Sequence, residues 1–165
     1  MKPPHLLLAG GNVRRVKENL VNTVDAAAIQ AIEADIRKNV SQLFALGTSH
    51  YNFAVRQPER CWRQRVSRLY YGACNVSRAV RLFVNGEFCT DATDHKKIAA
   101  LPDDFPNKST HANKLTALRE DRNLCDYDHT GTRSDLMLGV ADSAGVVADF
   151  IKNAEQYFHQ KGFMI

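Results

Sequence analysis

The chain has 165 residues, of which 44% are hydrophobic and 24% charged, and it carries a formal net charge of +4. This length and composition are typical of one globular domain that buries a core without disulfides or a metal. The apolar run near the N-terminus is too short for a signal peptide, and no later segment has the length of a membrane span, so we expect a cytoplasmic protein that does not contact a membrane.

The four cysteines and the known short motifs exclude several classes of protein. Cys61, Cys74, Cys89 and Cys125 are far apart and form no Cys-x-x-Cys pair, so neither a metal site nor a disulfide framework is expected. Cys125 lies on an apolar stripe and is expected in the core. No phosphate-binding P-loop, dinucleotide fingerprint or Gly-x-Ser-x-Gly motif occurs, so no cofactor is predicted.

The first part of the chain predicts an arm and a long helix. Residues 1–22 contain prolines, glycines and a basic cluster, and they are expected to form an N-terminal arm before a domain over residues 23–165. Apolar residues at helical spacing predict a helix from about Thr23 to Leu46, which Thr23 or Asp25 could cap. Gly47 is expected to end it, and residues 48–57 are expected to form a connector.

A second helix is predicted from Pro58 to Asn85-Gly86. Its apolar residues follow one another at alternating steps of four and three, from Trp62 to Phe83, which is a strong helix signal and indicates a central place in a bundle. Residues 53–85 also contain seven arginines and a single acid, Glu59. Such a strip suits phosphates, although an arginine-rich helix face is more often simply solvated.

The remainder predicts a long connection and two further helices. Residues 94–101 are expected to form a short helix within an irregular segment. Ser109 or Thr110 is expected to cap a third long helix that extends to a stop at Thr130-Gly131. Thr132 and Asp135 resemble a capping box for a last helix that ends near Gly162. The predicted fold is therefore all-α, an antiparallel bundle of four long helices with one short one.

Arg122 stands out because it lies on the inward-facing stripe of the third helix. The stripe continues through Cys125 to His129, so Arg122 and His129 are expected on one side of the last two turns. A buried guanidinium is costly unless it is paired or reached by water, which indicates a cleft or a subunit interface. Alternatively, Arg122 pairs with Asp121 or Asp126, and His129 only interacts with the end of the helix.

Three blocks in a fixed order resemble the HEPN family (higher eukaryotes and prokaryotes nucleotide-binding domains). The first block, residues 67–80, resembles the family's Tyr-Tyr helix through Tyr70 and Tyr71. The second, residues 93–97, resembles a Thr-His-Lys segment, with an additional Asp94. The third, residues 118–128, resembles a run that joins an arginine to Asp-Tyr. The resemblance covers roughly residues 25–160 and implies a HEPN-like helical bundle.

Many members of this family are metal-independent ribonucleases, and the resemblance implies a composite site across a homodimer. Arg122 would stabilise charge on the attacked phosphate, His129 would act as general acid or base on the RNA 2′-hydroxyl, and Asn123 would orient them. The products would carry 2′,3′-cyclic phosphates. Candidate residues for binding RNA or a nucleotide are Arg68, Arg78, His95, Lys96 and Arg119.

A second interpretation stays open, since members with the Tyr-Tyr helix often lack the histidine. The chain would then be a HEPN module without catalysis that binds a nucleotide, or an adaptor for a nucleotidyltransferase or another protein. If it is a ribonuclease, a role as a toxin or in defence is implied, with an antitoxin as partner. An unrelated helical interaction domain is the third possibility.

Overall fold

The structure is a computed structural model that describes residues 17–18, 22, 25–86 and 92–165. Most of the predicted N-terminal arm, residues 1–22, lies outside the described residues, although Lys17 forms an ion pair with Glu33. The long helices are α3 (Ala26–Arg56), α4 (Trp62–Asn85), α5 (Lys108–Tyr127) and α6 (Val140–Gln160). The short 3₁₀ helices are η1 (Glu59–Cys61), η2 (Ala92–Lys97) and η3 (Arg133–Asp135). The described ranges contain no strand, so the all-α class and the four long helices are confirmed.

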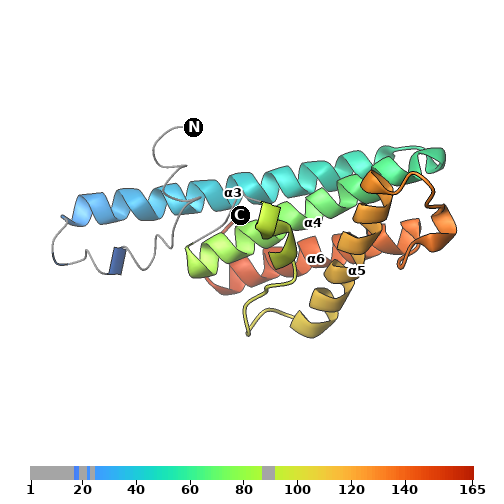
Figure 1. The fold of residues 1–165 in the computed structure, drawn as a ribbon. Helices are drawn as coiled ribbons and strands as arrows, with labels where there is room; N and C mark the ends of the chain where they lie inside the picture. The colour runs from blue at the N-terminus through green and yellow to red at the C-terminus, as the bar shows by residue number, and fades with distance from the viewer. Residues whose placement is uncertain (1–16, 19–21, 23–24, 87–91) are drawn as a thin grey trace.

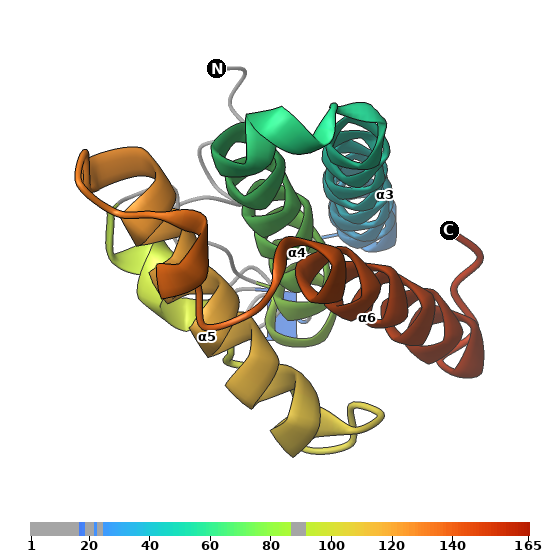
Figure 2. The ribbon, with the colours of Figure 1, turned by 90° about the vertical axis from the view of Figure 1, so that its right-hand side faces the viewer.

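Helix α4 occupies the centre of the fold. Figure 1 shows α3 and α4 side by side and running in opposite directions, with α5 crossing α4 obliquely. Seen along the helices, α4 lies between α3 on one side and α5 and α6 on the others (Figure 2). The central place predicted for the second helix is therefore confirmed, and α4 is the element that positions groups from the three others.

The first long helix extends ten residues beyond its predicted end. Asp25 caps it as expected, because its carboxylate accepts a hydrogen bond from the N–H of Ala28 at 2.7 Å. Gly47 does not stop the helix. A Cβ at Gly47 would lie only 2.7 Å from the carbonyl oxygen of Gly72 on α4, so this glycine allows the two helices to approach closely. The predicted connector over residues 48–57 was wrong, since α3 is helical to Arg56.

The boundaries of the last two helices also differ from the predictions. Helix α5 begins at Lys108 after Asn107, which has a left-handed backbone, and it ends at Tyr127 instead of reaching Thr130-Gly131. The capping box of Thr132 and Asp135 exists, but it closes the short η3 and not the last helix. Helix α6 starts only at Val140. Before it, the carboxylate of Asp121 accepts the backbone N–H groups of residues 137 and 138 and ties this segment to α5.

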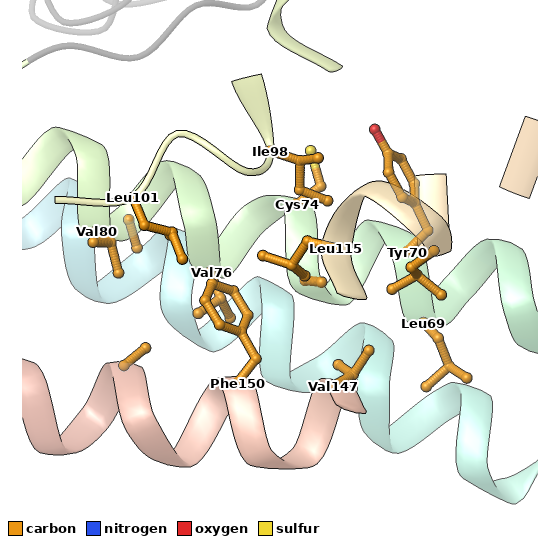
Figure 3. Close-up of a cluster of buried hydrophobic side chains, with 14 of the residues drawn as sticks. Leu69, Tyr70, Cys74, Val76, Val80, Ile98, Leu101, Leu115, Val147 and Phe150 are labelled. Atoms are coloured by element: carbon orange, nitrogen blue, oxygen red, sulfur yellow. The ribbon is translucent and has the colours of Figure 1, made fainter. Parts of the chain in front are cut away.

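The hydrophobic core surrounds α4, where this helix meets α3, α5 and α6. Figure 3 shows Leu69 and Val76 of α4, Leu115 of α5, and Val147 and Phe150 of α6 in this core. Phe83 of α4 and Phe158 of α6 continue it with an edge-to-face contact at 5.3 Å. Burying this many large side chains fully is the main favourable contribution to folding.

Within the described ranges, no helix combines the length and the apolar character that crossing a membrane requires.

Candidate functional site at Arg122 and the groove between α4 and α5

Arg122 is buried on the face of α5 that packs toward α4, as the apolar stripe predicted. Its Nη2 donates a hydrogen bond to the hydroxyl of Tyr71 at 2.6 Å, and its Nη1 donates to Asn123 at 3.2 Å. Its Nε lies 2.8 Å from a carboxylate oxygen of Asp126, one turn further along α5. The alternative in which Arg122 pairs with Asp126 is therefore the observed arrangement. Asp121 does not take part, because it binds the segment before α6.

Three tyrosine rings surround the Arg122 guanidinium. Its central carbon lies 5.4 Å from the ring centre of Tyr70, 5.3 Å from that of Tyr71 and 4.9 Å from that of Tyr127. A cation near aromatic faces is stabilised by the ring quadrupoles, more so where water is excluded. These contacts offset part of the cost of burying the guanidinium and fix its plane.

His95 of η2 also belongs to this cluster and contacts two of the same tyrosine rings. Its Nδ1 shares a hydrogen bond of 2.7 Å with the hydroxyl of Tyr70, and its ring lies edge-on to Tyr71 at 6.2 Å. Burial, and then the nearby cations Arg122 and Arg78, lower the pKa of His95 and so favour its neutral ring. The structure thus brings together residues of all three blocks on which the family resemblance was based.

A groove opens beside this cluster between α4 and α5. Its volume is about 470 Å³, and its walls are formed by Arg63, Gln64, Ser67, Arg68, Tyr71, Cys125 and Asp126. Two partners of Arg122, Tyr71 and Asp126, are therefore part of the groove wall. Burial raises the pKa of the Cys125 thiol to about 12, so this residue is a neutral wall group and not a nucleophile, consistent with the core position expected for it.

Arg63 lines the groove and has a structural role. Its Nη1 donates to the backbone carbonyls of Leu124, Cys125 and Asp128 at 3.2, 3.0 and 2.7 Å, and its Nη2 donates to that of Gly131. The last carbonyls of a helix lack partners within the helix and carry a partial negative charge, which a guanidinium satisfies. Arg63 thereby fixes the end of α5 and the loop that follows it.

Two more arginines of the basic strip are also used internally. Arg78 Nε lies 2.5 Å and Arg81 Nη2 lies 2.8 Å from opposite oxygens of Asp94, whose side chain is fully buried. This arrangement anchors η2 to α4. Arg78 is thus held by a buried carboxylate, and the strip as a whole is not a free phosphate-binding surface. Arg68 is exposed, lies over the ring of Phe53 and faces the groove.

The remaining predicted site residues are not all near the groove. His129 does not project from α5 beside Arg122; it is exposed in the loop after the helix, which ends at Tyr127. The expectation that both side chains lie on one side of one helix was therefore wrong. Asn123 contacts Arg122 but also Glu120. Arg119 pairs with its neighbour Glu120 at 2.6 Å, and Lys96 is exposed on η2.

Sequence reasoning missed Tyr71, Ser67 and Gln64 as groove residues. The hydroxyl of Tyr71 accepts the shortest hydrogen bond of Arg122. The available signal was the spacing, because residues 64, 67, 68 and 71 share one face of a helix. The spacing does not show which helix packs on this face of α4. In the structure that helix is α5.

Comparisons with family models, curated proteins and solved structures found no match to this chain. In the part of the chain that the structure describes, no group of three or more His, Cys, Asp and Glu side chains is arranged to hold a metal ion.

Proposed function

We propose that this chain is a HEPN-like module that binds a nucleotide in the groove between α4 and α5 without cleaving RNA. The proposal is supported by contacts among the three sequence blocks that resemble the HEPN family. Tyr70 and Tyr71 come from the first block, His95 from the second and Arg122 from the third. These residues form a cluster beside the groove, whose wall contains Tyr71, and a groove with a few polar groups at its wall is typical of a binding site.

The observation that carries the proposal is the state of Arg122. A catalytic arginine must offer N–H groups to the charge that develops on phosphate. Here Nη1 and Nη2 donate to Asn123 and Tyr71, and Nε faces Asp126. The side chain is also only 9% exposed. The two hydrogen bonds, the facing carboxylate and the low exposure support binding in the neighbouring groove over direct catalysis by Arg122 as it stands in the empty site.

The groove has the size and the groups that a nucleotide requires. About 470 Å³ lies within the range of small-molecule sites, roughly 300–1,000 Å³. Arg68 is exposed at the groove and supplies a cation for a phosphate group, for which a planar guanidinium is well suited. Gln64 and Ser67 supply polar groups, and the ring of Tyr71 supplies an apolar wall.

Calorimetric titration with adenosine 5′-monophosphate tests this proposal. Arg68→Ala is expected to weaken binding at least tenfold, since a charge-assisted hydrogen bond contributes about 1.5–3 kcal/mol. Arg60→Ala is the matched control, because it removes the same charge from an exposed position on η1 and should leave the affinity within about twofold. No binding by the wild-type protein, or an equal loss in both variants, contradicts the proposal.

A homodimeric ribonuclease is the second candidate function. It is favoured by the exposure of His129 in the loop that Arg63 fixes at the end of α5, where a second copy of the chain could meet it. Incubation of labelled RNA with the protein in EDTA tests it, beside an Arg122→Ala/His129→Ala variant. Cleavage by the parent alone, with cyclic phosphate ends, would replace the binding proposal.

The partners implied by the resemblance are part of the same proposal. A homodimer is expected in solution, and a nucleotidyltransferase or another protein is the expected partner of a module without catalysis. Light scattering after gel filtration gives the mass of the assembly. A monomer at all concentrations would contradict the dimer and, with it, any composite site.

A further inference from the structure

Asp126 occupies the position at which a ligand phosphate would reach Arg122. Its carboxylate lies 2.8 Å from Arg122 Nε and forms part of the groove wall. Its side chain is 26% exposed, whereas that of Arg122 is 9% exposed. An anion that enters the groove therefore meets Asp126 before it meets the guanidinium.

The contact between Arg122 and Asp126 is close but poorly directed. Although the two atoms are 2.8 Å apart, the Nε–H makes no hydrogen bond of acceptable geometry with any group of the described chain. A buried donor without an aligned acceptor costs free energy. The Nε–H of this residue, which is more than nine-tenths buried, is thus left for an acceptor that approaches from a better direction.

Two features make Asp126 easy to displace. It lies in the last turn of α5, where the partial negative charge of the helix end disfavours a carboxylate. It also has a second partner, because the hydroxyl of Ser67 lies 3.3 Å from the same carboxylate oxygen. A carboxylate that turns away from Arg122 therefore has Ser67 and water as alternative partners.

We propose that Asp126 is an internal competitor that covers Arg122 in the empty groove and is displaced from it by the phosphate of a bound nucleotide. This inference rests on the proposed nucleotide binding and adds a regulation of that same site. The free energy of separating the Arg122–Asp126 pair lowers the affinity for anions. Only a ligand with a phosphate, and not a neutral nucleoside, offsets that cost.

The test compares the affinities of wild-type protein and Asp126→Asn for adenosine 5′-monophosphate. The variant keeps the shape of the side chain and removes its charge, so binding is expected to tighten roughly tenfold. The matched control is Asp103→Asn, an exposed carboxylate before the other end of α5 that pairs with Lys108. This control removes the same charge and should change the affinity less than twofold.

The outcomes separate the two proposals. Tighter binding by Asp126→Asn alone supports the inference, including the case in which only this variant binds measurably. Equal affinities of the wild-type protein and Asp126→Asn overturn the inference and leave nucleotide binding in place. No binding by either protein overturns both.

A measurement on the wild-type protein covers the case in which Asp126→Asn does not fold. The NMR resonance of the Arg122 Nε–H should shift when the nucleotide saturates the protein, because its acceptor changes from carboxylate to phosphate. Adenosine, which has no phosphate, should leave that resonance in place. An unchanged Arg122 resonance at saturation with the nucleotide would overturn the inference.

Discussion

Asp94 and Asp126 both bind arginines of the helical bundle, and the surroundings of these two carboxylates differ. Asp94 is fully buried and lies between Arg78 and Arg81 of α4, which it joins to η2. Asp126 is partly exposed, faces Arg122 with poor alignment and borders a groove. The same chemistry therefore stabilises the fold at Asp94 and leaves an accessible charge pair at Asp126. Burial and alignment, and not the presence of an ion pair, separate a structural contact from a candidate binding site.

The largest expected effect comes from breaking the buried cluster. Asp94→Asn leaves Arg78 and Arg81 without their compensating charge, which should lower the free energy of unfolding by about 3–5 kcal/mol. Urea denaturation followed by circular dichroism measures it. Asp103→Asn, whose partner Lys108 is also at the surface, is the control and should cost less than about 1 kcal/mol. Similar values for the two variants would contradict the distinction between the two carboxylates.

A smaller loss is expected for Arg63, which lines the groove. Arg63→Ala removes the donor that satisfies four backbone carbonyls at the end of α5 and in the loop after it. The expected cost is about 1.5–3 kcal/mol, together with faster hydrogen exchange in residues 128–131. Arg63→Lys should not restore stability, because an ammonium cannot reproduce the fork of the guanidinium. Full rescue by lysine would show that only the charge matters.

The third prediction concerns the pH dependence of stability. It centres on His95, which follows Asp94 in the chain and contacts Tyr70 beside Arg122. Burial and the nearby arginines hold its pKa in the folded state below the usual value of about 6.5. The unfolded chain therefore binds a proton more readily, and stability should fall as the pH drops below about 6.5. Burial also lowers the pKa values of His50 and His111, so they add to this fall.

His95→Gln should make the fall in stability between pH 6.5 and 5 less steep. Denaturation midpoints at several pH values, for both proteins, measure the difference. An NMR titration of the wild-type protein gives the same sign through the individual ring resonances. A folded His95 that titrates above 6.5 would reverse the sign and contradict the surroundings described for it.

The smallest change in stability is expected for Asp126→Asn. The pair is partly exposed and poorly aligned, so its loss should alter the free energy of unfolding by about 1 kcal/mol or less. Beside the loss expected for Asp94→Asn, this value sharpens the contrast between the two carboxylates. A cost as large as that of Asp94→Asn would assign Asp126 a structural role and remove the reason to treat it as displaceable.

The sequence predicted the helices well because their apolar spacing is set by burial along a single element. It also predicted that Arg122 faces inward and identified Asp126 as a possible partner. Helix ends that depend on contacts with another helix were predicted wrongly. Glycine often ends a helix, but Gly47 instead lets α3 approach Gly72 of α4 closely. The segment before α6 is bound by Asp121 of α5, which accepts the backbone N–H groups of residues 137 and 138.

The same limit applies to the candidate site. Helical spacing placed His129 near Arg122, but the helix ends first, at Tyr127. The charges of residues 53–85 were visible in the sequence, whereas the carboxylate and carbonyl groups that bind Arg63, Arg78 and Arg81 were not. Which arginines are free is a property of the packed helices, and only Arg68 of the predicted ligand-binding arginines lies exposed at the groove.

The central claim is that a nucleotide binds between α4 and α5, and a two-dimensional NMR titration with adenosine 5′-monophosphate tests it most directly. Amide shifts should concentrate at residues 63–71 and 122–126, they should reach saturation as nucleotide is added, and the affinity should fall at higher salt. Shifts that fall elsewhere, or no shifts at millimolar nucleotide, would contradict it.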